Sequence, residues 1–208
     1  MKYSTIKIRT SEKLDIPKFK FYEPRRNLPE KSSRKNRERD FTLGFARSYV
    51  SQISAFHRGT TRTEIDFARE IPINGFGISD FVVVSWDPKK LKGKKSVSDV
   101  TDFLRVAVPV LRAFELKISN WRKALMQASR YKYFANVSIV VLPTEKLKIA
   151  SNYLATFKAI NVGLWGFSQK SKQIISLYTP RPCKPFESKY TPQAIELVSK
   201  ASKSLPIS

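Results

Sequence analysis

The chain has 208 residues, 41% of them hydrophobic, which is enough for one folded domain and too many for a disordered chain. Its 39 Lys and Arg against 17 Asp and Glu leave a net charge of +22, which attracts polyanions, nucleic acid before anionic membrane. One cysteine and one histidine exclude a disulfide framework, a Cys-based zinc cluster and any mechanism that needs two histidines. We find no apolar run long enough to span a membrane and no secretory signal, and therefore expect a cytoplasmic protein without a membrane partner.

Residues 1–40 are predicted to form a basic N-terminal arm. Prolines interrupt this segment, and its polar, basic run at 31–39 has nothing to bury, although a short strand at 3–9 fits the pattern. We expect residues 41–180 to form the folded core and residues 181–208 to form a C-terminal extension with a short helix.

The core is predicted to begin with a helix and a β-hairpin. Apolar side chains recur every three or four residues over 41–57, which predicts the helix. The next segment alternates apolar and polar residues, which predicts a half-buried strand. Its buried side is expected to carry Ile65, Phe67, Ile71 and Ile73.

The elements that follow suggest a mixed sheet. A turn at 74–77 precedes a strand over 78–86, and a basic loop leads to a helix over 97–107 with Ser96 as its N-cap. The remaining elements, in chain order, are a strand over 110–118, a helix over 119–134, a strand over 137–142, a helix over 145–160, strands over 162–167 and 173–178, and a helix over 191–202. This order predicts an α/β fold with a mixed central β-sheet flanked by helices.

The most informative stretch for chemistry is Arg112-Ala-Phe-Glu-Leu-Lys-Ile118. In a strand, Glu115 and Lys117 point to one face while the apolar residues beside them point to the other. A Glu-x-Lys tripeptide also occurs at 187–189, but there it lies in a proline-rich segment without alternation. The strand context therefore selects Glu115 and Lys117.

A second carboxylate comes from the preceding strand. Asp80 lies where the turn passes into the buried run Phe81-Val-Val-Val84. An acid at that position either caps the turn or faces a cleft where it binds a cation, and the sequence leaves both readings open.

In this order, Asp80 and Glu115-x-Lys117 resemble the PD-(D/E)xK nuclease superfamily, the restriction-endonuclease-like fold of many restriction endonucleases and Holliday-junction resolvases. Ser79 stands where that motif frequently has proline. Gln127 and Tyr131, one turn apart on the predicted helix, are similar to the Gln-x-x-x-Tyr pattern that several of its families carry beside the active site. The resemblance covers about residues 41–180.

The sequence departs from that pattern in two places. Many members carry an acid on the first helix, but 41–57 contains none, so we expect Glu64 or Glu70, or less readily Gln52, to complete the site. The separation between Asp80 and Glu115 is also long, because the basic loop and a helix lie between the two strands.

The resemblance implies a Mg²⁺-dependent nuclease with Asp80 and Glu115 as metal ligands and Lys117 as the catalytic lysine. The residue types fit that chemistry, because Mg²⁺ prefers oxygen ligands, lowers the pKa of its bound water and screens the phosphate. Lys117 would orient that water or stabilise the transition state. We expect Mn²⁺ to substitute for Mg²⁺, and Gln127, Tyr131 and Glu64 to lie beside the site.

The expected substrate is DNA rather than RNA, and an endonuclease is preferred because the domain shows no helicase or processivity partner. Phosphate contacts are expected from the loop lysines and from two arginines of the 119–134 helix, with a solvated surface as the alternative; these residues are Lys89, Lys90, Lys92, Lys94, Lys95, Arg122 and Arg130. A homodimer is left open. The rival hypothesis is a non-catalytic, basic nucleic-acid-binding protein, for DNA or RNA, with the same fold.

Overall fold

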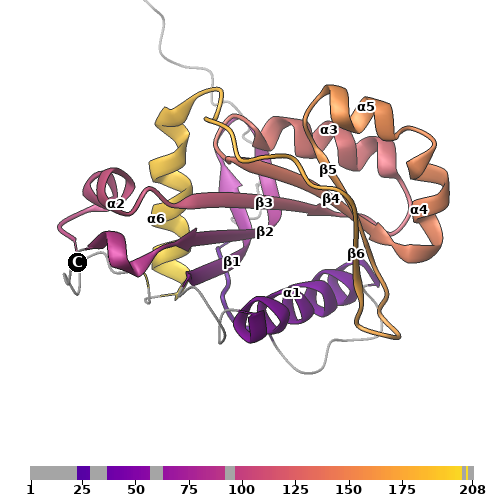
Figure 1. Cartoon of the computed structure of the whole chain (residues 1–208), viewed down its shortest axis with the longest axis horizontal. Coiled ribbons are helices and arrows are strands. Elements are labelled where there is room, and N and C mark those ends of the chain that lie inside the picture. Colours follow the sequence, from indigo (N-terminus) through magenta and orange to yellow (C-terminus); the bar gives the residue numbers. More distant parts are fainter. Residues whose placement is uncertain (1–22, 29–36, 57–62, 92–96, 203–204, 206–208) are drawn as a thin grey trace, which may run out of the picture.

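The computed structural model describes residues 23–28, 37–56, 63–91, 97–202 and 205, and shows an α/β fold with a mixed six-stranded sheet flanked by helices (Figure 1). Its elements, in chain order, are α1 (Arg37–Phe56), β1 (Glu64–Ile73), β2 (Gly77–Trp86), the 3₁₀ turn η1 (Pro88–Leu91), α2 (Val100–Ala107), β3 (Val110–Leu116), α3 (Trp121–Tyr131), β4 (Val137–Pro143), α4 (Thr144–Ser151), α5 (Leu154–Ala159), β5 (Gly163–Phe167), β6 (Ile174–Tyr178), the 3₁₀ turn η2 (Ser188–Tyr190) and α6 (Thr191–Ser202). The predicted α/β class and mixed sheet are therefore confirmed.

The strands lie side by side in the order in which they occur in the chain. β1, β2 and β3 are antiparallel, β3, β4 and β5 are parallel, and β6 returns antiparallel to β5. Each parallel connection needs a crossover, which α3 provides between β3 and β4, and α4 with α5 between β4 and β5. The sheet thus joins an antiparallel half to a parallel half at β3.

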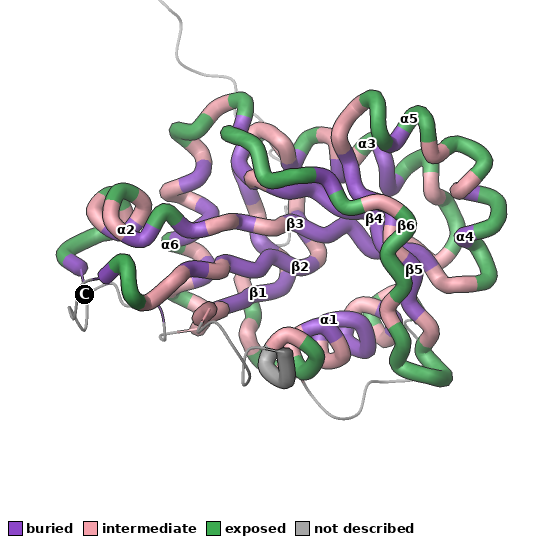
Figure 2. Tube along the Cα trace, in the orientation of Figure 1, coloured by how far each residue is buried: buried purple, intermediate pink, exposed green. Residues whose placement is uncertain are grey.

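Alternate side chains of the strands enter cores on opposite faces of the sheet. Phe81 and Phe114 pack with Phe45 of α1 on one face, in a cluster rich in aromatic contacts. On the other face, Val82 packs beneath α2 and α6, and Val140 packs beneath α3, α4 and α5. Figure 2 shows the buried strands enclosed between these helices. The central strands are therefore covered on both faces, as their apolar runs require.

The alternation expected along β1 is interrupted at Glu70. Ile65 and Phe67 pack against the α1 side, but Ile71 and Ile73 belong to the core beneath α6, so the prediction that all four share one side is wrong. Glu70 has a φ of 59°, and this left-handed residue breaks the two-residue repeat of the strand.

Two helices begin elsewhere than expected, and one divides. α1 starts at Arg37 rather than Phe41, with two acids in its first turn, where the positive end of the helix dipole favours them. The N-cap of α2 is Asp99, which accepts a hydrogen bond from the Asp102 backbone N–H, and not Ser96, which lies outside the described residues. The expected helix over 145–160 divides into α4 and α5.

Both ends of the described chain are fastened to β1. Arg25 exchanges backbone hydrogen bonds of 3.0 and 2.8 Å with Arg69, so part of the predicted N-terminal arm extends the sheet edge. α6 buries Ala194, Ile195 and Val198 in the core, so the expected C-terminal extension belongs to the same folded unit. The strand expected at 3–9 lies outside the described residues. No helix of the described part of the chain is long and apolar enough to cross a membrane.

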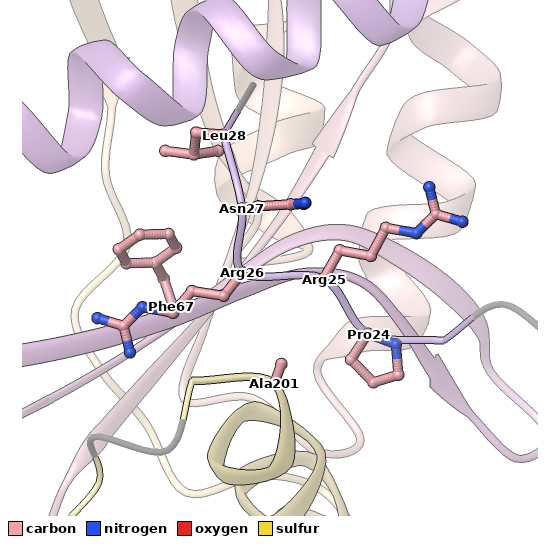
Figure 3. A pocket seen from close by; sticks show the side chains of 7 residues that line it. All are labelled: Pro24, Arg25, Arg26, Asn27, Leu28, Phe67 and Ala201. Atoms are coloured by element: carbon pink, nitrogen blue, oxygen red, sulfur yellow. The ribbon is translucent and has the colours of Figure 1, made fainter. Parts of the chain in front are cut away.

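A shallow pocket marks the seam where the N-terminal segment crosses β1 between α1 and α6 (Figure 3). Arg26 points into this seam, where its guanidinium lies 5.1 Å from the Phe67 ring centroid and 2.7 Å from the Asp66 carboxylate. It also donates to the Ser202 carbonyl at 3.1 Å. The pocket is thus the junction that joins residues 23–28 and the end of α6 to β1. Its lining comprises Pro24, Arg25, Arg26, Asn27, Leu28, Phe67 and Ala201.

Candidate active site

The candidate site lies where β2 and β3 part from each other. Their last cross-strand pair is Phe81 with Phe114, although β2 begins at Gly77 and β3 continues to Leu116. Asp80 and Glu115 occupy the next position of that register, on the face opposite α1. Instead of the backbone ladder, the Asp80 side chain accepts a hydrogen bond of 2.8 Å from the Leu116 backbone N–H. The parting therefore places two carboxylates opposite each other between separated strands.

Tyr131, at the end of α3, contacts the Glu115 side chain. The Tyr131 hydroxyl contacts Glu115 Oε2 and also lies 2.8 Å from the carbonyl oxygen of Ile78. A phenol has one proton and the carbonyl can only accept, so both contacts form hydrogen bonds only when Glu115 carries a proton and donates it to Tyr131. The geometry thus suits a protonated Glu115.

Burial and mutual repulsion explain why a proton stays at the carboxylate pair. Burial raises the pKa of Glu115 to about 8, with a further contribution from the Asp80 charge. Burial also raises the pKa of Asp80 to about 6, against the opposing effect of its hydrogen bond from Leu116. A bound cation would reduce the repulsion between two such neighbouring carboxylates.

Lys117 lies beside this pair and joins it to α1. Its Nζ is 3.4 Å from Glu115 Oε1 and 3.7 Å from Glu38 Oε2. Burial alone would lower the pKa of Lys117, but the carboxylates of Asp80, Glu115 and Glu38 outweigh it and raise that pKa. Lys117 is therefore an ammonium group, suited to stabilising negative charge rather than to removing a proton.

Glu38, one of the two acids in the first turn of α1, lies at the candidate site but is not predicted from the sequence. The apolar repeat starts at Phe41, so the sequence places the charged segment before it in the predicted arm, whereas α1 begins at Arg37 and includes Glu38. A signal was present, because acids are frequent in the first turn of a helix. The side chain of Glu38 is 44% exposed and that of Lys117 18%, so the site opens to solvent on this side.

The three residues expected to replace a first-helix acid do not take that place. Glu64 pairs in register with Trp86, six residues along β2 from Asp80 and so about 20 Å away, which contradicts its assignment to the site. Gln52 lies on α1 and reaches the carbonyl of Lys172. Glu70 is near enough for its charge to raise the pKa of Asp80, but it pairs with Arg25 and Arg69 at 3.6 Å each.

The oxygen atoms at the site fit a divalent ion. Within the described residues no three His, Cys, Asp or Glu side chains form a metal centre, and the carboxylates that lie opposite each other here are Asp80 and Glu115. Glu115 Oε1 and Gln127 Oε1 are buried and accept no hydrogen bond. Gln127 lies one turn before Tyr131 on α3, which runs back along β3, so it lies toward the strand end that carries Lys117. Mg²⁺ needs one or two carboxylates and keeps its remaining waters.

The predicted phosphate-binding lysines do not gather at this site. Lys89 and Lys90 are exposed on η1, beyond the Trp86 end of β2, whereas Asp80 is near its beginning. They are therefore more than about 20 Å along the strand from the carboxylates, so a phosphate that they contact would lie away from the carboxylate pair, and their phosphate contacts stay a prediction. Lys92, Lys94 and Lys95 lie outside the described residues.

The two arginines of α3 are both exposed but occupy its opposite ends. Arg122 is in the first turn, next to the segment that follows Lys117. Arg130 adjoins Tyr131 but points about 100° away from it around the helix. Of the two, Arg122 lies at the end of α3 nearest the candidate site.

Comparisons with protein-family models, with curated proteins and with solved structures found no match to this chain.

Proposed function

We propose that this protein is a Mg²⁺-dependent nuclease of the restriction-endonuclease-like type that hydrolyses phosphodiester bonds of DNA, as an endonuclease. The observation that carries the proposal is the convergence of Asp80, Glu115 and an ammonium group, Lys117, where β2 and β3 separate. The net charge of +22 adds a field that attracts nucleic acid.

The arrangement of elements supports the same proposal. The resemblance found in the sequence implies a helix, an antiparallel hairpin, a third strand with the Glu-x-Lys motif, then a helix and a further strand. The fold has this order in α1, β1, β2, β3, α3 and β4, with η1 and α2 inserted between β2 and β3. The insertion accounts for the long separation of Asp80 and Glu115 in the chain.

Each residue at the site has a role that follows from its surroundings. Asp80 and Glu115 would hold the ion with their carboxylates after losing their protons, and Tyr131 orients Glu115 by its hydrogen bond. Lys117 stabilises charge that develops on the phosphoryl oxygens, and Glu38 orients the Lys117 side chain. When bound, Mg²⁺ or Mn²⁺ would polarise the phosphate and lower the pKa of a water molecule.

Cleavage of supercoiled, linear and branched DNA by the purified protein tests this proposal. We expect cleavage with Mg²⁺ or Mn²⁺ that stops with EDTA and falls in Asp80→Asn and Lys117→Met. Glu196 and Lys200 form an exposed ion pair on α6, with Nζ 2.7 Å from Oε1, so Glu196→Gln and Lys200→Met are matched controls that should retain activity.

Binding distinguishes the proposal from its rival. If the wild type binds DNA but cleaves none with either metal, the protein is a non-catalytic binding protein and the nuclease proposal is wrong. A competition assay against RNA of the same sequence tests the preference for DNA, which tighter binding of the RNA would contradict.

A further inference from the structure

Three side chains form a stacked group on the surface beside α3. The rings of Trp121 and Tyr153 have centroids 4.6 Å apart, and the guanidinium carbon of Arg122 lies 4.6 Å from the Trp121 ring and 5.3 Å from the Tyr153 ring. Arg122 also donates a hydrogen bond of 3.2 Å to the Tyr153 hydroxyl. We name this group, Trp121, Arg122 and Tyr153, the aromatic–arginine cluster.

The cluster is anchored on its inner side and open on its outer side. Trp121 is partly buried and lies 6.0 Å, between ring centroids, from the fully buried Phe157. Arg122 is exposed, and Tyr153 has 40% of its surface exposed. Met126, one turn further along α3, is 65% exposed and extends the apolar surface on this side of the helix.

Arg122 forms no ion pair with an acid in the described residues, and neighbouring side chains hold its guanidinium in place. Within the described part of the chain no carboxylate pairs with Arg122, which contacts the two rings and the Tyr153 hydroxyl. A guanidinium held against aromatic rings presents a flat, cationic face to solvent. Flat aromatic and guanidinium faces are the surfaces on which unpaired nucleobases stack.

The position of the cluster relates it to the candidate active site. β3 ends at Leu116, and Trp121 begins α3 only four residues after Lys117. A chain extends at most about 3.5 Å per residue, so the Cα atoms of Lys117 and Trp121 are within about 14 Å of each other. That span corresponds to about four nucleotides of a stacked strand, at about 3.4 Å each.

We infer that the aromatic–arginine cluster is a stacking platform for an unpaired base of the DNA strand whose phosphate occupies the site of Asp80, Glu115 and Lys117. This inference rests on the proposed function and specifies its substrate as DNA with a single-stranded segment next to the cleavage position. A fully paired duplex keeps its bases stacked inside the helix and offers none to the platform.

Binding measured in EDTA tests the inference without any cleavage. Fluorescence anisotropy compares a single-stranded oligonucleotide with a duplex of the same length, and 2-aminopurine fluorescence reports stacking of a base. Arg122→Lys keeps the charge but removes the planar group, and Tyr153→Leu keeps apolar bulk but removes the ring. Because both positions are exposed, the variants should fold, which thermal unfolding monitors.

We expect each variant to weaken single-strand binding about tenfold and to leave duplex binding within twofold, with loss of the 2-aminopurine quenching. Lys123, the exposed neighbour of Arg122, provides the control: Lys123→Ala should weaken single-strand and duplex binding equally. Unchanged single-strand binding in both variants, or an equal loss for single strand and duplex, would overturn the inference.

The two proposals can fail separately. Stacking signals that depend on Arg122 and Tyr153, in a protein that cleaves no DNA, would refute the nuclease but keep the platform. Metal-dependent cleavage that both variants carry out as the wild type does, on single-stranded and duplex DNA alike, would refute the platform but keep the nuclease.

Discussion

Two fully buried carboxylates on either side of β2 in the sheet, Asp66 on β1 and Glu115 on β3, have opposite surroundings. The Asp66 side chain accepts hydrogen bonds from Arg26 at 2.7 Å and from the Phe67 backbone N–H at 2.8 Å, and contacts the Ser202 hydroxyl. Glu115 faces a second carboxylate, and its Oε1 accepts no hydrogen bond. A buried acid whose two oxygens both have hydrogen-bond partners serves the fold, whereas an acid that lies beside another acid, with only an ammonium group 3.4 Å from its second oxygen, is arranged for a ligand.

The largest expected effect is on the cleavage rate, which should depend on Glu115 but not on Asp66. Glu115→Gln should lower the cleavage rate by about 10²–10³-fold, because it removes one of the two metal-holding carboxylates. The same substitution should leave stability unchanged or higher, since a neutral amide replaces a buried acid with a raised pKa. Initial rates of plasmid nicking, with urea unfolding of the same preparations, measure both effects. A Glu115→Gln protein of normal activity would contradict the site.

Asp66→Asn should show the reverse behaviour. Loss of this carboxylate removes the negative charge 2.7 Å from the Arg26 guanidinium and loosens the junction with Ser202, at a cost of about 2 kcal/mol, since Arg26 is partly exposed. The rate per folded molecule should stay at the wild-type value. Urea unfolding and a rate measured well below the unfolding temperature test this, and a stable but inactive variant would reverse the assignment of roles.

The carboxylate pair should make stability depend on pH when no metal is present. The folded-state pKa values of about 8 for Glu115 and about 6 for Asp80 exceed the usual 4.5 and 3.8, so the folded state binds protons that the unfolded state has released. Stability from these groups is therefore complete below about pH 4 and is lost as pH rises toward 8. The slope is about 1.4 kcal/mol per pH unit for each retained proton.

Unfolding curves of wild type and Glu115→Gln between pH 5 and 8 measure this dependence. The wild type should lose stability relative to the variant as the pH rises, and Mg²⁺ should restore more of it at pH 8 than at pH 6, because protons compete with the ion. A constant difference between the two proteins over this range would contradict the raised pKa of Glu115.

The smallest expected effect concerns Glu38. Its side chain is 44% exposed and 3.7 Å from Lys117, so Glu38→Gln should lower the cleavage rate about threefold and leave stability within about 0.5 kcal/mol. The effect should shrink in high salt, which screens exposed charge pairs. The variant Glu145→Gln, which removes an exposed acid from α4, provides the comparison.

The sequence predicted the parts of this site that depend on local periodicity. Alternation in β3 placed Glu115 away from Phe114, and helical spacing placed Gln127 and Tyr131 on one side of α3. It did not predict Glu38, because the charged first turn of α1 lacks the apolar repeat by which the rest of the helix was found.

Other features depend on contacts between distant segments, which periodicity does not encode. The separation of β2 from β3 arises from the Asp80 side chain and the Leu116 backbone. The charge of the η1 lysines is visible in the sequence and predicts phosphate contacts, while their distance along β2 from the carboxylates is not. The contact of Trp121 with Tyr153 likewise depends on how α3 packs against the α4–α5 junction.

The hydrogen bond from the Leu116 backbone to Asp80 has a consequence for mutagenesis. The Asp80 carboxylate takes the place of a backbone hydrogen bond between the strands, and so keeps β2 and β3 apart beyond the Phe81–Phe114 pair. An alanine there removes both the negative charge and the side chain that separates the strands. The Leu116 backbone N–H is then able to form a strand-to-strand hydrogen bond, which extends the pairing of β3 with β2. Slower amide hydrogen exchange at Leu116 in Asp80→Ala than in Asp80→Asn would reveal this closure, so the asparagine variant isolates the effect of charge.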